Sequence, residues 1–248
     1  MTRWKLTIEY DGTGLSGWQK QANAPSVQQA IEQAIEKFCG EAVNIHVAGR
    51  TDAGVHARAQ VAHIDLARET DANTLCNAIN FHVRPNKIVI LSAEPVDQTF
   101  HARFGAMGRA YRYRIVNRRP PLALQAAYAW HVVKPLDIDA MQMAADCLIG
   151  PHDFSTFRAQ FCQAKSPIRT LDKLKFTRDG EDITLETEAR SFLYHQVRNM
   201  VGSLVLVGNG QWTLADFKAA FAARDRSKGG PTAPAHGLCL WSVTYPQK

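Results

Sequence analysis

The stretch A-G-R-T-D-A-G-V-H-A, from Ala48 to Ala57, decides how the first part of the chain is interpreted. Residues 43–47 alternate between apolar and polar side chains, as a half-buried strand does. The sequence therefore predicts that Asp52 lies just past a strand end, on a loop flanked by Gly49 and Gly54. Glycine permits a left-handed backbone and the close approach of another backbone or a ligand.

One carboxylate and one guanidinium lie close together in this loop, because Arg50 precedes Asp52 by two residues. If both face a cleft, the cation favours the ionised form of the acid, and an ionised carboxylate suits a nucleophile. The alternative is a plain turn in which Asp52 caps backbone amides. Composition alone favours that alternative, because Thr-Asp-Ala-Gly is ordinary turn chemistry.

The elements around the loop follow the order β-α-β-β-α-β, which is that of a ferredoxin-like sandwich. A helix begins at Ser26, where Ser26 and Gln29 match a capping box, and it ends at Gly40. The other elements expected here are strands over 4–10, 43–47, 60–66 and 87–93, and a helix over 71–81.

The second half repeats this rhythm loosely. It predicts strands over 109–116, 127–132, 171–177, 183–188 and 237–245, and helices over 137–148, 192–207 and 214–223. We therefore expect an α+β fold of two lobes, residues 1–108 with the Asp52 loop and residues 109–248, with a cleft between them.

The net charge of +6 is unevenly spread. Residues 1–110 hold as many acids as bases, so residues 111–248 carry the whole excess. Gln98–Leu136 contains no acid, and its cations are Arg103, Arg109, Arg112, Arg114, Arg118, Arg119 and Lys134. With Tyr111 and Tyr113 interleaved, such a stretch offers charge for phosphates and rings for bases, which favours a nucleic-acid groove over a solvated face.

Arg198 interrupts an apolar helix pattern. A buried guanidinium without a partner costs several kcal/mol in order of magnitude. A structural ion pair, or a helix-end arginine that reaches solvent, accounts for it somewhat better than pairing with Asp52 does.

Composition argues against several classes of protein. No apolar run approaches the length of a membrane span, and the first residues lack the apolar region of a signal peptide, so we expect a cytoplasmic protein. The five cysteines are scattered without a C-x-x-C pair, and the nine histidines are scattered too. These patterns argue against a disulfide framework and a metal site.

Several motifs together resemble one family. G-R-T-D-A-G-V-H-A at 49–57 resembles the signature loop of the TruA tRNA pseudouridine synthases. Further blocks resemble other family motifs in the family's order: E-Y-D-G (9–12), G-W-Q (17–19), F-H-A-R-F (100–104), R-A-Y-R-Y (109–113), D-F-S-T-F-R (153–158) and V-R-N-M-V-G-S (197–203).

The resemblance implies two ferredoxin-like lobes that share a central, mostly antiparallel sheet, with helices on one face and a basic cleft between the lobes. It also implies a homodimer without a cofactor, which isomerises uridine to pseudouridine at positions 38, 39 and 40 in the anticodon arm of tRNA. An alternative is a non-catalytic RNA-binding protein on the same fold. A nucleoside or sugar hydrolase is a further alternative, but it would want a second carboxylate.

The resemblance also implies roles for single residues. Asp52 would be the catalytic aspartate, Arg50 would displace the target base, Tyr111 would pack on the flipped uracil, and Arg198 would pair with the aspartate. Contacts to tRNA are expected from Phe100, His101, Ala102, Arg103, Phe104, Arg119, Phe161, Cys162, Gln163, Ala164 and Lys165.

The residues make chemical sense of this reaction. It breaks the N1–C1′ bond, turns the base and joins C5 to C1′, so no atom is added and nothing is oxidised. Positive charge develops at the sugar, and an ionised carboxylate stabilises or traps it. A base inside a stem must flip out to be reached, and a ring such as that of Tyr111 holds it by stacking. Attack on the sugar, attack on the base and removal of a sugar proton remain open alternatives for Asp52.

Overall fold

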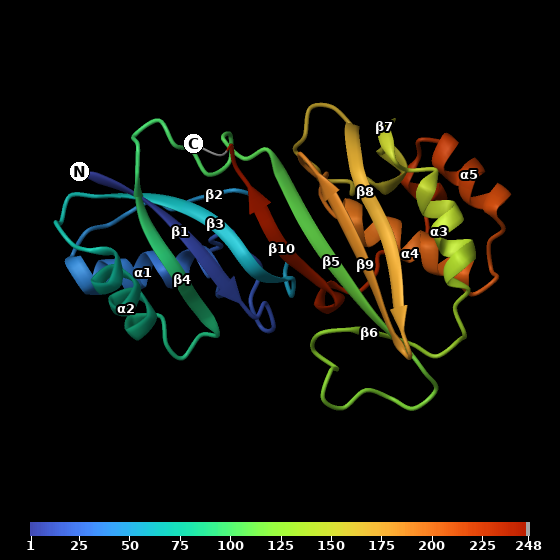
Figure 1. Ribbon diagram of the computed structural model, residues 1–248, viewed down its shortest axis with the longest axis horizontal. Helices are drawn as coiled ribbons and strands as arrows, with labels where there is room; N and C mark the ends of the chain where they lie inside the picture. Colours follow the sequence, from blue (N-terminus) through green and yellow to red (C-terminus); the bar gives the residue numbers. More distant parts are fainter. Residues whose placement is uncertain (247–248) are drawn as a thin grey trace. The chain divides into compact units, whose positions relative to one another are not determined.

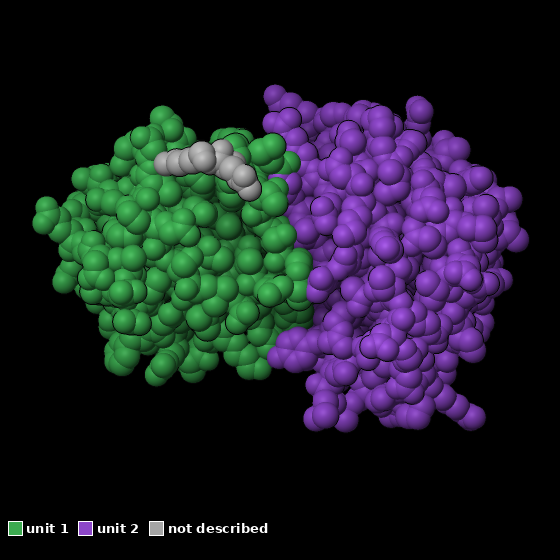
Figure 2. Space-filling model, viewed as in Figure 1, with its two compact units in different colours: residues 1–107, 239–248 green, residues 108–238 purple. Residues whose placement is uncertain are grey.

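The computed structural model describes residues 1–246, which divide into two compact units (Figure 2). Unit 1 combines Met1–Met107 with the segment from Cys239 onward, and unit 2 is Gly108–Leu238. The sequence places that last segment in the second lobe. It belongs instead to unit 1, where its strand pairs in parallel with the strand at residues 56–66.

Unit 1 has the ferredoxin-like order predicted from the sequence (Figure 1). Its elements are β1 (Thr2–Tyr10), α1 (Val27–Cys39), β2 (His46–Val47), β3 (His56–Leu66), α2 (Ala72–His82), β4 (Ile88–Val96) and β10 (Leu238–Thr244). β1 lies between β4 and β3, and both pairings are antiparallel. β2 also pairs antiparallel with β3.

Helix α1 begins and ends where its sequence signals place it. The Ser26 hydroxyl accepts from the Gln29 amide, and Gly40 ends the helix in the left-handed conformation with φ 75°. The buried residues Val27, Ile31, Ala34 and Ile35 share one face and form the core of unit 1 together with alternate residues of β1. Their spacing is therefore what fixes the helix against the sheet.

Two differences from the sequence prediction bear on the Asp52 loop. β2 covers only His46–Val47 rather than 43–47, and β3 begins at His56 rather than 60. The same edge of β3 is shared by two partners, because β2 pairs at Ala62–His63 and β10 pairs in parallel at His56–Ala57. The Asp52 loop therefore leads directly into a strand that has partners from its first residues.

Unit 2 is also α+β with mostly antiparallel strands. Its elements are β5 (Gly108–Asn117), β6 (Trp130–Val132), α3 (Ile138–Asp146), β7 (Gly150–Asp153), a 3₁₀ turn (Ser155–Phe157), β8 (Ile168–Asp179), β9 (Asp182–Ala189), α4 (Gln196–Gly208), α5 (Leu214–Ala222) and 3₁₀ turns at Arg226–Lys228 and Ala235–Gly237. The strands follow the order β5-β9-β8-β7, and β6 pairs in parallel with β5.

The α+β class with mostly antiparallel sheet is confirmed in each unit. Helix α4 is buried along most of its length and begins at Gln196, four residues later than its apolar pattern predicts. His195 stands before it with φ 60°, a conformation outside the helix. No helix within residues 1–246 is long and apolar enough to cross a membrane.

Candidate active site

Asp52 lies between β2 and β3, past a strand end as the sequence predicts. Its side chain is half-buried, and its carbonyl oxygen accepts from the Val55 amide at 3.1 Å, which closes a turn. Gly54 has φ 77° in this turn, and its amide donates to Leu15 at 3.3 Å. The backbone of the loop is therefore a tight turn, and the neighbouring segment around Leu15 supports it.

Thr51, the residue before Asp52, is held on both sides. Its hydroxyl lies 2.7 Å from the Tyr10 hydroxyl, and its carbonyl accepts from the Trp18 amide at 3.1 Å. Burial raises the pKa of Tyr10, so this hydroxyl stays neutral at physiological pH. Trp18 is buried, so its ring belongs to the core. These contacts fix the backbone from which the Asp52 side chain projects.

Two glycines allow the segment after β1 to touch the Asp52 loop. A Cβ at Gly17, which has φ 96°, would lie 2.6 Å from the Thr51 carbonyl oxygen. A Cβ at Gly12 would lie 2.2 Å from the Val55 carbonyl oxygen. Any other residue at either position would push the two segments apart. The glycine-rich run at 12–17 is the sequence signal for this close contact.

The two ends of the loop are fixed by side chains that sequence reasoning missed. The fully buried Gln60 amide donates to the Gly49 carbonyl oxygen at 2.7 Å. The His56 Nδ1 accepts from the Gly12 amide at 3.0 Å and lies 3.1 Å from Asp11 Oδ1. Lys87 in turn lies 3.0 Å from the other oxygen of Asp11. Polar side chains therefore support the loop at both ends.

Arg50 is exposed in the same loop. Its guanidinium is accessible from solvent, whereas the half-buried Asp52 is partly covered. That both face one cleft stays a prediction.

Tyr111 and Arg198, the other residues to which the resemblance assigns a role in the reaction, belong to unit 2. Tyr111 lies half-buried on β5, with its ring edge-on to Phe192 at 5.2 Å. Arg198 lies in the first turn of α4, and its Nε donates to the Ala233 carbonyl at 2.8 Å. The Ala233 amide donates back to the Arg198 carbonyl at 3.1 Å. Arg198 is thus anchored to the segment after α5.

The stretch at 98–136 contains no acid in sequence, but acids from other segments lie beside some of its arginines. Carboxylates from β9 and the turn before it lie 2.7–3.2 Å from three of its arginines. The pairs are Arg112–Glu186, Arg114–Asp182 and Arg118–Glu181. The alternation predicted for β5 explains the first two, because the arginines share the sheet face that carries these acids.

The remaining cations of the stretch differ in exposure. Arg109 is buried and donates to the Arg190 carbonyl at 2.6 Å. Arg103, Arg119 and Lys134 are exposed. Positive charge at the surface therefore comes from fewer side chains than the sequence count indicates.

The segment at 160–165 is tied to its surroundings by its backbone. Arg158 donates to the Cys162 and Ala164 carbonyls at 2.9 and 2.6 Å, while Phe161 is 82% exposed. Burial raises the pKa of the Cys162 thiol, but amide donors and Arg158 outweigh it, and the pKa is lowered overall. Gln163 and Lys165 are exposed. This segment presents an aromatic ring and a cation, the two groups that bind single-stranded nucleic acid.

Comparisons with known proteins agree across the whole chain. The sequence model of a family described as tRNA pseudouridine synthase matches residues 6–105 and 144–246. A protein of Paramagnetospirillum magneticum named tRNA pseudouridine synthase A is 58% identical over 99% of this chain and 96% of its own length. A protein of the same name from Rhodospirillum centenum is 57% identical over 99% of this chain and 100% of its own length.

A solved structure of a Cbf5-Nop10-Gar1 complex aligns with 82% of this chain and 45% of its own, at 11% identity and a TM-score of 0.39. That score is too low to support a conclusion. By contrast, the family model and the relatives do support a conclusion, because they match residues of both units, including the loop around Asp52. The chain belongs to the tRNA pseudouridine synthase family.

Proposed function

We propose that this enzyme isomerises uridine to pseudouridine at positions 38, 39 and 40 of the tRNA anticodon arm, with Asp52 as the catalytic carboxylate. Family membership supports the reaction and the substrate class. The single observation that carries the assignment of Asp52 is the bracing of its loop through Thr51, which is bonded to both Tyr10 and Trp18. Catalysis needs a reacting group held in one geometry, and this backbone supplies it.

Asp52 stabilises or traps the positive charge that develops at C1′ when the N1–C1′ bond breaks. The released base turns, C5 joins C1′, the proton leaves C5 for solvent, and N1 takes up a proton, so the product is an isomer of the substrate. Water has to be kept out, because its attack at C1′ would give free uracil. A half-buried carboxylate is suited to this, since it is reachable by a flipped nucleotide and partly shielded from solvent.

Three further residues take roles by their match to the family motifs. Arg50 displaces the target base, and its exposed side chain supports this role. Tyr111 packs on the flipped uracil, while Arg198 pairs with the catalytic carboxylate. The chain acts as a homodimer in the cytoplasm, and light scattering that gives the mass of one chain would contradict the dimer.

The assignment of Asp52 is tested by release of tritium from tRNA labelled at uridine C5. Wild-type protein is expected to release tritium, and Asp52→Asn is expected to release none while its tRNA affinity stays within about twofold. Glu94→Gln is the matched control, because it removes one exposed carboxylate from edge strand β4 and should leave release unchanged. Equal release by wild type and Asp52→Asn would refute the assignment.

The positions are tested separately by mapping pseudouridine in tRNA after reaction with the wild-type protein. Pseudouridine at 38, 39 and 40 is the expected outcome. Modification confined to another arm of the tRNA would overturn the positions but leave the reaction class intact. Free uracil in place of pseudouridine would identify a hydrolase instead.

A further inference from the structure

The turn at 97–104 is held against the rest of unit 1 by side chains from β1, from β3 and from the residue that follows β10. Asp97 begins it by accepting from the Thr99 amide and hydroxyl at 2.8 and 2.6 Å. Further on, the His101 Nδ1 accepts from the amides of Arg103 and Phe104 at 3.1 and 3.3 Å. The turn is thus shaped internally, and its position depends on the contacts that follow.

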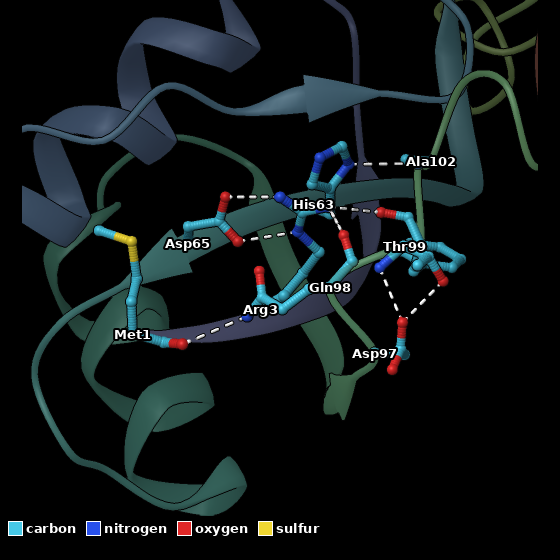
Figure 3. Close-up of polar contacts among 9 residues, drawn as sticks. Met1, Arg3, His63, Asp65, Asp97, Gln98, Thr99 and Ala102 are labelled. Carbon is cyan, nitrogen blue, oxygen red and sulfur yellow. Dashed lines mark hydrogen bonds and ion pairs between the residues drawn. The ribbon is translucent and has the colours of Figure 1, made fainter.

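Arg3 on β1 makes the first contact (Figure 3). Its Nη1 donates to the carbonyl oxygens of Gln98 and, at 2.9 Å, of Phe100. Its Nε and Nη2 donate to the two oxygens of Asp65 on β3, both at 2.8 Å. These bonds hold the pKa of Asp65 below its usual range. Asp65 therefore fixes the planar guanidinium, which reaches the turn with its remaining donor group.

His63 and Tyr245 make the second and third contacts. The Ala102 amide donates to His63 Nδ1 at 3.2 Å, and the Tyr245 hydroxyl donates to the Ala102 carbonyl at 2.6 Å. Ala102 is fully buried, so its side chain belongs to the core, next to Val61 and Ala48. The turn is therefore held through both the amide and the carbonyl of Ala102.

His63 keeps its acceptor because it is neutral. Burial, together with the nearby His46 and His101, lowers the pKa of His63 to about 4. Its ring stacks on His46 at 4.9 Å and meets His101 edge-on at 4.8 Å. The three imidazole rings therefore pack against one another.

Arg103 and Phe104, which follow Ala102 in the turn, are exposed. Phe104 is 74% exposed, with the Arg103 guanidinium 5.7 Å from its ring centre and the His101 ring 4.4 Å away. An exposed ring beside a cation offers stacking to a base and charge to a phosphate. This exposed ring sits on a turn that the contacts of Arg3, His63 and Tyr245 hold in place.

We propose that Arg3, His63 and Tyr245 are positioning residues for tRNA binding, which fix the turn so that Arg103 and Phe104 together meet the RNA. None of the three touches the substrate. The proposal rests on the proposed function, because it assigns how one RNA-contacting turn of that same enzyme is oriented. It predicts that losing Arg3 weakens tRNA binding only through the turn.

A double-mutant cycle tests this dependence. Arg3→Ala is expected to raise the Kd and KM for tRNA about tenfold and to leave kcat within about twofold. The tip variant, Arg103→Ala with Phe104→Ala, is expected to lose at least as much affinity. Adding Arg3→Ala to the tip variant should then weaken tRNA affinity by less than about twofold, because the side chains that the turn positions are already gone. Additive losses would overturn the proposal.

Arg68→Ala is the matched control. Arg68 also belongs to unit 1, and its guanidinium likewise donates to a backbone carbonyl, that of Phe38 at 3.2 Å, away from the turn. It removes the same charge and should change the affinity for tRNA less than about twofold. Arg3→Lys keeps the charge but loses the planar fork, so it should restore affinity only in part. An equal loss of tRNA affinity for Arg68→Ala would mean that Arg3→Ala acts only by removing a positive charge.

If Arg3→Ala unfolds, Tyr245→Phe keeps the proposal testable, because it removes one hydroxyl and keeps the ring. It should raise KM a few-fold without changing kcat, and no change in either parameter would overturn the role of Tyr245. The assay of the wild-type protein distinguishes a failure of the proposed function from a failure of the role assigned to the turn. Absence of pseudouridine formation by wild type would sink the proposed function, whereas additive cycles with an active wild type sink only the role of the turn.

Discussion

The Asp52 loop and the acid-free stretch at 98–136 are both singled out by sequence, and the structure treats them differently. The loop is held by hydrogen bonds with Tyr10 and Trp18, and by two glycines at which any side chain would clash with the loop backbone. The stretch instead loses much of its charge to β9 and the turn before it, where Glu186, Asp182 and Glu181 pair with its arginines.

The difference lies in what each pattern requires of the rest of the chain. A loop motif with glycines and short polar residues can adopt few conformations, so its residue types restrict the local structure. A count of charges along a segment says nothing about which acids another strand brings opposite. Cross-strand pairing is decided by register, and it joins residues about 70 positions apart here.

Among changes to the neighbours of the Asp52 loop, the largest expected effect is that of Gly17→Ala. The new Cβ would lie 2.6 Å from the Thr51 carbonyl oxygen, a backbone atom, so the Asp52 loop must shift. A misplacement near 1 Å costs on the order of 10²-fold in rate, and we expect kcat in the tritium assay to fall by that amount.

Gly14→Ala is the control for Gly17→Ala. Gly14 also has a positive φ, 77°, but a Cβ there meets no atom within 4 Å. It should show the strain cost of about 1 kcal/mol in thermal unfolding and nearly normal kcat. Equal loss of kcat in both variants would mean that close packing on the loop does not govern turnover.

Tyr10→Phe has the next largest expected effect. It leaves the buried Thr51 hydroxyl without the partner it now has at 2.7 Å, which costs about 1–3 kcal/mol of stability. We expect single-turnover rates to fall about tenfold as the loop loosens. Combining Tyr10→Phe with Thr51→Val removes both polar groups and should recover part of the stability. A double variant less stable than Tyr10→Phe alone would argue against this hydroxyl pair as the brace.

Arg119→Gln should have a smaller effect, on affinity alone. Arg119 is exposed and can contact a phosphate. Loss of one phosphate contact should make the slope of log affinity against log salt concentration shallower by about one. Arg114→Gln removes an arginine of the same stretch that is already paired with Asp182 and should change affinity less than about twofold. Equal salt dependence for the two variants would mean that pairing with an acid does not decide which arginines of the stretch bind tRNA.

Elements with strong local signals are predictable here. Helix α1 begins after Ser26 and ends before Gly40, as its capping residues indicate. The sequence does not predict β7, because Gly150 and Pro151 argue against a strand, although an edge strand tolerates proline. The start of α4 was placed too early because the apolar run continues through Leu193. That residue's amide bonds the Gln196 side chain instead of continuing a helix.

The candidate site divides in the same way. The place of Asp52 after a strand follows from the alternation before it and the glycines around it. The support from Gln60, His56 and Gly12 does not, because these contacts join segments whose proximity only the folded sheet creates. Ala102 was expected at the RNA surface from a motif that also contains Arg103 and Phe104. A motif does not show which of its members faces the core.

The return of β10 to unit 1 sets an order of events during synthesis. The ribosome makes all of unit 2 before it makes Cys239 and Leu240, the residues that pair with His56 and Ala57 just after the Asp52 loop. A nascent chain therefore carries the Asp52 loop long before the neighbouring strand exists, and domains usually fold as they emerge. The sheet of unit 1 therefore gains this strand only after all of unit 2 has been synthesised.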